Sequence, residues 1–225
     1  MGTSSHISKG LGPEASNTGE PLPGKDQRPI VAFDFDGTLS VRDSFMALLA
    51  WRTPGLRFVS GLLKLAPAGS RYLFNRDRNA LKAAAVSEFL TGVTRNQLET
   101  DSAGFRDAVW DSFMRPDALA CWAEWGDRGA LRVIVTASPE TIVAPFAEKL
   151  GADRLIGTRL RFDAQDRVAG DFVGLNCRGA EKVRRLEEAF GPDLNLVAAY
   201  GDTAGDTEML ARSAVPGYRV FTAKP

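Results

Sequence analysis

The chain has 225 residues, 44% of them hydrophobic, and its 28 basic and 28 acidic side chains give a formal net charge of zero. Such a length can bury a sizeable core in one domain, with or without an insertion, and the balanced charge gives no support to a nucleic-acid partner. Two cysteines, Cys121 and Cys177, and one histidine, His6, argue against disulfide frameworks, zinc sites and histidine-based catalysis, which leaves carboxylates, hydroxyls and lysine as candidate catalytic groups.

The first 29 residues are rich in glycine, serine, proline and polar side chains without periodicity. This composition is typical of a flexible tail or of a remnant of an expression tag. Residues 19–25 have the spacing of a phosphate-binding loop, but Asp26 stands where that loop has serine or threonine, and no strand precedes it. Neither this segment nor the rest of the chain contains the apolar stretch of a signal peptide or membrane span, so we expect a cytoplasmic protein.

Residues 30–33 are apolar and predict a buried strand, which leads directly into Asp34, Phe35, Asp36, Gly37 and Thr38. Ligands bind at the carboxyl edge of an open parallel sheet. If the strand continued through Asp36, both carboxylates would share one side of it, and Gly37 would then allow a turn. Paired carboxylates repel each other unless a proton or a cation such as Mg²⁺ lies between them. A plain acidic turn after the strand fits the same residues.

After Thr38 the apolar residues recur with helical spacing. We expect Asp43 to cap a helix that runs through Leu49, followed by helices at 56–65, 79–90, 95–113 and 116–125. The next strand is predicted at 131–135. The sequence therefore predicts a core domain formed by residues 30–42 and 116–225, with a helical cap domain, residues 43–115, over the carboxyl edge of the sheet.

The stretch from Trp51 to Lys82 has seven basic residues against one acid, Asp77, which is a net charge of +6. Aromatic and aliphatic residues are interleaved with these charges. Such a segment could bind an anionic lipid surface or a phosphorylated substrate. It could equally be a helical hairpin with its apolar face in the core and its basic residues in water.

Polar residues also follow two later strands. After residues 131–135 come Thr136, Ala137 and Ser138, where Thr136 and backbone N–H groups could hold a phosphoryl group and Ser138 could cap the next helix. A strand pair is predicted at 158–162 and 168–173, and Lys182 lies early in the helix that follows. A strand at 196–200 then leads into Gly201, Asp202, Thr203 and Asp206. A helix cap explains only one of the two acids.

Asp34 to Thr38, then Thr136, Lys182, and Asp202 with Asp206 resemble the four motifs of the haloacid dehalogenase superfamily of phosphohydrolases. The resemblance covers residues 30–212 and implies an α/β fold, a Rossmann-like three-layer core with a mainly parallel sheet and a small helical cap inserted after the first strand. The position of the cap resembles subfamily IB, which includes phosphoserine phosphatase. Residues 176–179 (Asn-Cys-Arg-Gly) resemble its bacterial phosphatidylglycerophosphatase C-like branch.

The resemblance implies roles for individual residues. Asp34 would be the nucleophile that forms an aspartyl phosphate, and Asp36 the general acid and base. Mg²⁺ would be held by the carboxylates of Asp34 and Asp202 and by the backbone carbonyl of Asp36. The phosphoryl group would be bound by Thr136, Ala137, Gly37, Thr38 and Lys182, with Asp206 and Thr203 in support. A halide leaving group needs no proton, so the acid at position 36 favours phosphate esters over halogenated substrates.

Three features separate the chain from phosphoserine phosphatase. Asp43 stands where that enzyme has a glutamate that contacts the substrate amine, Gly205 replaces an asparagine, and no arginine for the substrate carboxylate can be placed. We therefore predict a Mg²⁺-dependent phosphatase for an organic or lipid phosphate monoester, with peripheral contact between the cap and an anionic membrane as a further expectation. The alternatives are a phosphoserine phosphatase, a phosphotransferase acting on a small metabolite and an inactive phospholigand-binding module.

Overall fold

The computed structural model describes residues 28–66 and 78–225. The rest of the amino-terminal tail, with His6 and the loop-like residues 19–25, lies outside the described residues. So does part of the basic stretch, residues 67–77. Among the helices of the described ranges, none is long and apolar enough to cross a bilayer.

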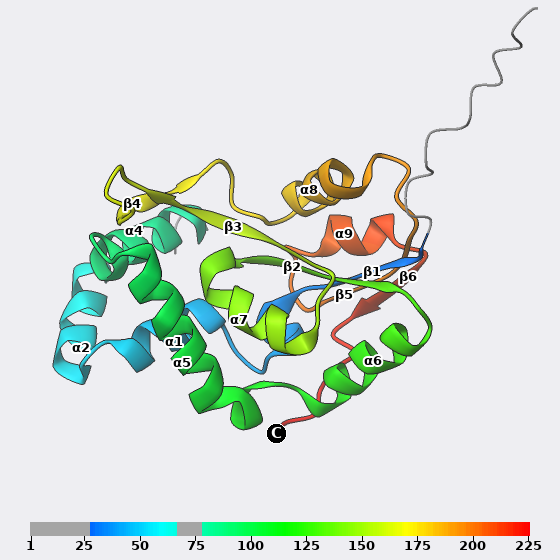
Figure 1. Cartoon of the computed structure of the whole chain (residues 1–225), viewed down its shortest axis with the longest axis horizontal. Helices are drawn as coiled ribbons and strands as arrows, with labels where there is room; N and C mark the ends of the chain where they lie inside the picture. Colours follow the sequence, from blue (N-terminus) through cyan, green and yellow to red (C-terminus); the bar gives the residue numbers. More distant parts are fainter. Residues whose placement is uncertain (1–27, 67–77) are drawn as a thin grey trace, which may run out of the picture.

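The described elements form an α/β fold around one six-stranded sheet with the order β4-β3-β2-β1-β5-β6 (Figure 1). The strands are β1 (Ile30–Phe33), β2 (Leu131–Pro139), β3 (Arg154–Phe162), β4 (Val168–Val173), β5 (Leu196–Gly201) and β6 (Val215–Tyr218). The helices are η1 (Phe35–Leu39), α1 (Ser44–Arg52), α2 (Gly55–Lys64), α4 (Arg78–Leu90), α5 (Arg95–Phe113), α6 (Pro116–Asp127), α7 (Glu140–Leu150), α8 (Ala180–Phe190) and α9 (Thr207–Arg212). All pairings are parallel except that of β3 with β4, which confirms the predicted fold class.

Alternation along β1 divides the core into two apolar layers. Val31 and Phe33 are fully buried in the cluster that also contains residues of α6 and α7. Ile30 and Ala32 point to the opposite face and pack with residues of α8 and α9. Figure 1 shows the two helix pairs on opposite sides of the sheet. Since successive side chains of a strand point to opposite faces, an all-apolar β1 needs helices on both sides, and the three-layer prediction is confirmed.

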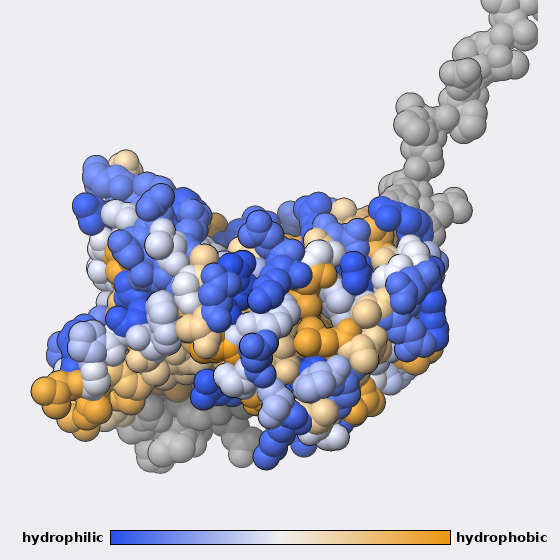
Figure 2. Space-filling view, turned by 60° about the horizontal axis from the view of Figure 1, so that its bottom comes forward, coloured by the Kyte–Doolittle hydropathy of each residue, from blue (hydrophilic) through white to orange (hydrophobic). Residues whose placement is uncertain are grey.

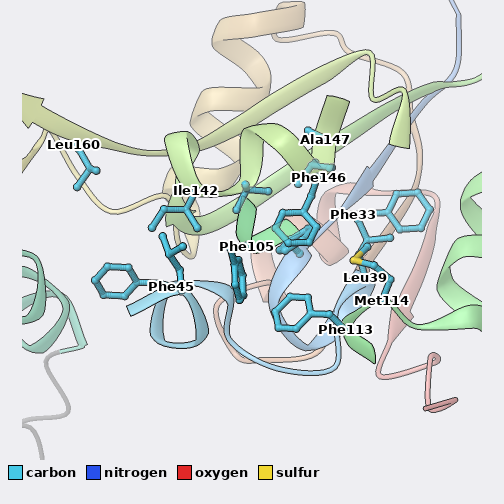
Figure 3. Close-up of a cluster of buried hydrophobic side chains, with 14 of the residues drawn as sticks. Phe33, Leu39, Phe45, Phe105, Phe113, Met114, Ile142, Phe146, Ala147 and Leu160 are labelled. Atoms are coloured by element: carbon cyan, nitrogen blue, oxygen red, sulfur yellow. The ribbon is translucent and has the colours of Figure 1, made fainter. Parts of the chain in front are cut away.

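Four helices, α1, α2, α4 and α5, lie between η1 and α6 in the chain, and we call them the helical insertion. Their observed bounds agree with the predicted helices to within one residue, except that α1 ends at Arg52, three residues after its predicted end. Phe105 and Phe113 of α5 pack against Phe146 of α7, with ring centroids 5.9 and 5.8 Å apart (Figure 3). This aromatic cluster fixes the insertion to a core helix and so holds it beside the sheet.

Several stretches of the core differ from what the sequence predicts, and β2 and β3 are each four residues longer than expected. β1 ends at Phe33, and Asp36 and Gly37 lie in the tight turn η1, where Gly37 has a φ of +84°. Strand alternation therefore does not place Asp34 and Asp36 on one side. The edge strand β6 has the sequence Val-Pro-Gly-Tyr and was not predicted, because proline and glycine are unfavourable in strands except at edges.

Candidate active site

Three acids from separate stretches of the chain meet at the carboxyl edge of the sheet. Asp34 follows β1, Asp202 follows β5 and Asp206 precedes α9, and each offers a carboxylate oxygen within 4.8 Å of the others. β1 and β5 are hydrogen-bonded neighbours, so their carboxyl ends bring the first two acids together. Asp34 and Asp206 are almost completely buried. We call these three residues the acidic centre.

Lys182 of α8 neutralises part of this charge. Its Nζ donates to Asp34 Oδ1, Asp206 Oδ1 and the carbonyl oxygen of Val135, each at 2.6 Å. These three bonds use all the hydrogens of the ammonium group, and only 1% of the residue is exposed. Burial opposes the charge of Lys182, but Asp34 and Asp206 outweigh it and raise the lysine pKa. Burial also raises the pKa of Asp34 to about 7, against the effect of the lysine charge.

Asp202 and Asp206 differ in how their oxygens are satisfied. Asp206 Oδ2 accepts from the backbone N–H and the hydroxyl of Thr203, at 2.9 and 3.0 Å. Although burial raises it, the pKa of Asp206 is lowered overall, chiefly by Lys182. Asp202 Oδ1 is buried and has no hydrogen-bond partner among the described residues. A buried carboxylate oxygen without a partner is unfavourable unless a cation binds it, so this donor set fits a hard divalent ion.

Gly37 allows Asp202 to approach the turn after β1. A Cβ atom at this position would lie 2.3 Å from Asp202 Oδ2, closer than real atoms come. The positive φ is also a conformation that favours glycine. Arg115 supports the same turn by donating to the Gly37 carbonyl oxygen at 3.2 Å. The glycine of this motif is therefore required by both the turn and its acidic neighbour.

Asp36 lies in contact with the helical insertion and is not part of the acidic centre. Its Oδ1 accepts from the backbone N–H of Ser44 at 2.7 Å, and its Oδ2 accepts from the hydroxyl of Ser138. The expectation that Ser138 caps the next helix is wrong, because α7 has Pro139 at its cap position and no side-chain cap bond. Burial, together with the charge of Asp43, raises the pKa of Asp36, while Lys82 opposes the shift.

The residues predicted to bind phosphate fall into two groups. Gly37, Ala137 and Lys182 line a cavity of about 740 Å³ that also contains Asp34, Asp36 and Asp202. Thr136 and Thr38 are buried. The Thr136 hydroxyl accepts from the Ser138 N–H at 3.0 Å, and the Thr38 hydroxyl has no partner within the described parts of the chain. For all five residues, phosphate binding stays a prediction.

Lys82 is a candidate functional residue that the sequence did not single out. It belongs to α4, lines the cavity and donates to the Ala137 carbonyl oxygen at 2.9 Å, with Nζ 5.6 Å from the centre of the Phe45 ring. In the sequence it is one of seven basic residues, and nothing local distinguishes it. Asp43 also lines the cavity, and its side chain accepts from the Met46 N–H as the predicted helix cap.

Comparison with known proteins agrees with this architecture. Residues 31–211 match the haloacid dehalogenase-like hydrolases, and the chain belongs to this family. It is 54% identical to protein CicA of Caulobacter vibrioides over the full length of both proteins. It is 27% identical to the "Inhibition of morphological differentiation protein" of Streptomyces azureus, over 81% of this chain and 68% of that one.

Solved structures share the fold at lower identity. A Bordetella pertussis protein of unknown function aligns over 85% of this chain and 89% of its own, with a TM-score of 0.68 and 21% identity. A phospho-aspartyl intermediate analogue of phosphoserine phosphatase aligns over 84% of both chains, with a TM-score of 0.55 and 20% identity.

Proposed function

We propose that this protein is a Mg²⁺-dependent phosphatase that hydrolyses organic or lipid phosphate monoesters through an aspartyl phosphate on Asp34. The observation that carries the proposal is the buried Lys182, bonded to both Asp34 and Asp206 beside the unpartnered oxygen of Asp202. A carboxylate can attack phosphorus only where cations neutralise the phosphoryl oxygens, and this centre provides one cation and ligands for another. Membership of a hydrolase family supports the same reading.

Asp34 and Asp202 are the carboxylates that would hold the ion, together with the backbone carbonyl of Asp36. Asp206 is assigned to positioning, because both its oxygens already accept hydrogen bonds from Lys182 and Thr203. When bound, Mg²⁺ offsets the negative charge of the carboxylates and of the phosphoryl oxygens. Oxygen ligands from carboxylates and carbonyls are the set that this ion prefers.

In the first step a carboxylate oxygen of Asp34 forms a bond to phosphorus as the bond between phosphorus and the ester oxygen breaks. Asp36 gives its proton to the departing alkoxide, and the raised pKa of its buried carboxyl favours the protonated form that this requires. Asp36 then takes a proton from a water molecule whose oxygen bonds to phosphorus as the bond between phosphorus and Asp34 breaks, which releases phosphate and restores the Asp34 carboxylate. Lys182 holds Asp34 in place, and backbone groups of Gly37 and Ala137, with Thr38 and Thr136, would bind the phosphoryl oxygens.

Phosphate release from an aryl phosphate, with and without Mg²⁺, tests the proposal. We expect wild-type activity that chelation abolishes and that Asp34→Asn lowers by at least about 1,000-fold, because the nucleophile is removed. A panel of phospholipids, sugar phosphates and phosphoamino acids follows. The proposal fails, and an inactive phospholigand-binding module is favoured, if the wild type is no more active than the variant on every compound.

The same assays, with alcohols added as phosphate acceptors, distinguish hydrolysis from the alternative activities. A phosphotransferase would pass phosphate to added alcohols in place of water. A phosphoserine phosphatase would need charged partners for the substrate carboxylate and amine, and Arg42, Asp43 and Lys82 line the cavity. Phosphoserine is therefore included as a competing substrate.

Peripheral contact with an anionic membrane, at its cytoplasmic face, belongs to the same proposal. Leu56, Val59 and Leu63 of α2 are 91%, 55% and 71% exposed, and Figure 2 shows apolar side chains gathered at this end of the molecule. Arg57 and Lys64 share one acidic partner, Glu88, which leaves this face an excess of positive charge. We expect co-sedimentation with anionic vesicles that Leu56→Ser with Val59→Ser weakens. Equal binding to neutral vesicles, or none to anionic ones, would remove this part of the proposal.

A further inference from the structure

The helical insertion gives the cavity above the acidic centre an apolar wall. The wall consists of Val41, Phe45, Met46, Leu62, Leu65 and Leu81, which come from α1, α2, α4 and their flanking loops. The acids and Lys182 lie in the same cavity. One cavity thus joins a charged floor, where phosphate is proposed to bind, to a wall whose side chains carry no hydrogen-bond donor and no acceptor beyond the weak thioether of Met46.

The two faces of α2 show how this wall is built. Phe58, Leu62 and Leu65 recur at helical spacing, with Leu62 and Leu65 in the cavity. The ring of Phe58 packs in a tilted arrangement against Phe89 of α4, with the ring centroids 5.5 Å apart. Gly61 allows this close packing, because a Cβ atom there would lie 2.4 Å from the Phe89 ring. Leu63 is on another side of the helix and is 71% exposed. The cavity-facing residues of α2 are therefore distinct from its outer face.

Lys82 marks the boundary between floor and wall. Its ammonium group binds the Ala137 carbonyl at the floor, close to the ring of Phe45 in the wall. A ligand whose phosphate lies at the acidic centre must extend past this boundary if it is longer than a few atoms. A small polar alcohol would leave the wall in contact with water, whereas an apolar group would displace that water favourably.

We infer that the alcohol portion of the substrate is an apolar chain or ring seated between α1, α2 and α4, so that the enzyme acts on amphiphilic phosphate monoesters. This inference rests on the proposed phosphatase activity for its catalytic readout. The apolar group contributes binding that is absent for ethyl phosphate or phosphoserine. The binding free energy that this apolar group contributes grows with the apolar area that the wall covers.

A series of linear alkyl phosphates from ethyl to octyl, below the concentrations at which they aggregate, tests the inference. We expect kcat/KM to rise about two- to fourfold for each methylene until the wall is covered, as burial of methylene groups predicts. Phosphoserine should be a poorer substrate than hexyl phosphate. Equal or falling kcat/KM along the series, with Asp34-dependent hydrolysis intact, overturns the inference and leaves the proposed function standing.

Two neighbouring leucines of α2 provide the variant and its matched control. Leu62→Ser replaces a side chain of the wall, and we expect it to flatten the dependence on chain length. Leu63→Ser makes the same change on the exposed face, and the wild-type dependence should persist. If both variants, or neither, change the dependence, the wall does not bind the alkyl group.

Binding of alkylphosphonates, which lack the ester bond, separates the inference from the proposed function. Calorimetric titration of the wild type with Mg²⁺ should give a Kd that falls about two- to fourfold per methylene and an increasingly negative heat-capacity change. If no phosphate ester is hydrolysed but this gradient is present, the phosphatase proposal fails and the apolar site stands. A Kd independent of chain length overturns the apolar site.

Discussion

The acidic centre and the apolar wall lie in one cavity but are built in opposite ways. The centre is made by residues at the ends of core strands and helices, and Asp34, Lys182 and Asp206 are buried and bonded to one another. The wall comes from the helical insertion, and its members include Leu62, which is 37% exposed. Charged groups demand fixed partners, whereas apolar contacts tolerate changes of shape. If the proposals hold, the core determines the reaction and the helical insertion determines which alcohol group the substrate carries.

Replacing Lys182 should have the largest effect, because it removes the cation of the acidic centre and leaves the apolar wall unchanged. In Lys182→Met the buried carboxylates of Asp34 and Asp206 lose their shared cation, which we expect to lower the free energy of unfolding by about 3–5 kcal/mol. Hydrolysis should fall by at least about 1,000-fold, since the phosphoryl charge is no longer neutralised. Denaturant unfolding and phosphate release measure the two effects.

Lys149→Met is the control for the loss of a positive charge. Lys149 is exposed at the end of α7, with its Nζ 4.2 Å from the centre of the Trp110 ring, a contact worth about 1 kcal/mol or less. Comparable stability losses in the two variants would show that Lys182 is not the cation on which the centre depends.

Gly37→Ala tests whether the turn after β1 must leave room for Asp202. The added Cβ would clash with Asp202 Oδ2 at a positive φ, so we expect the Mg²⁺ concentration for half-maximal activity to rise about 10- to 100-fold. Gly92→Ala has nearly the same φ, +81°, and nothing within 4 Å of the new Cβ. It should lose stability without a change in Mg²⁺ dependence. An unchanged Mg²⁺ dependence in Gly37→Ala would separate this glycine from the metal site.

Glu181 supports the helix that presents Lys182. It accepts hydrogen bonds from Arg184 and Arg185, at 2.8 and 2.7 Å, and these arginines, Arg184 first, lower its pKa from 4.5 to about 2. Because the pKa of Glu181 is lower in the folded state, its interaction with the two arginines stabilises the protein fully above about pH 4.5. This contribution is lost as the pH falls toward 2. We expect Glu181→Gln to lower the free energy of unfolding at pH 7 by about 1.5–3 kcal/mol.

Unfolding curves recorded between pH 7 and pH 2.5 measure this effect, and the difference between Glu181→Gln and wild type should shrink along that range. Glu188→Gln is the control, because its carboxylate pairs with Arg184 at 3.3 Å on an exposed face and contributes less than about 0.5 kcal/mol. A pH-independent difference for Glu181→Gln would contradict the role of its charge.

The sequence predicts the acidic centre better than the wall, for a physical reason. Asp34, Asp202 and the apolar strands before them are local patterns, and parallel strands bring their carboxyl ends to one edge. The direction of Asp36 could not be predicted, because it depends on where β1 ends, on the Ser44 N–H at the start of α1 and on Ser138, which is 102 residues away in the chain. Lys82 likewise acquires its role only through contact with Ala137.

The basic stretch shows how counting charges in a window misleads. Of its described residues, Arg52 pairs with Asp101, and Arg57 and Lys64 pair with Glu88, and both acids lie beyond Lys82 in the sequence. The net charge of +6 is therefore partly neutralised by acids from outside the window. The helices themselves were predictable because their apolar periodicity is local, but the distribution of α2 side chains between the cavity and the surface was not.

The smallest expected effect concerns Ser138, which connects β2 to Asp36. Ser138→Ala removes the hydroxyl that donates to Asp36 Oδ2, and we expect kcat for alkyl phosphates to fall about tenfold, about 1.4 kcal/mol, through loss of that orientation. Ser112→Ala, at an exposed hydroxyl of α5, is the control. Nitrophenolate needs no proton to depart, so hydrolysis of p-nitrophenyl phosphate should change little if Ser138 acts through the acid. An equal fall for both substrates would mean that Ser138 supports the site as a whole and does not position Asp36.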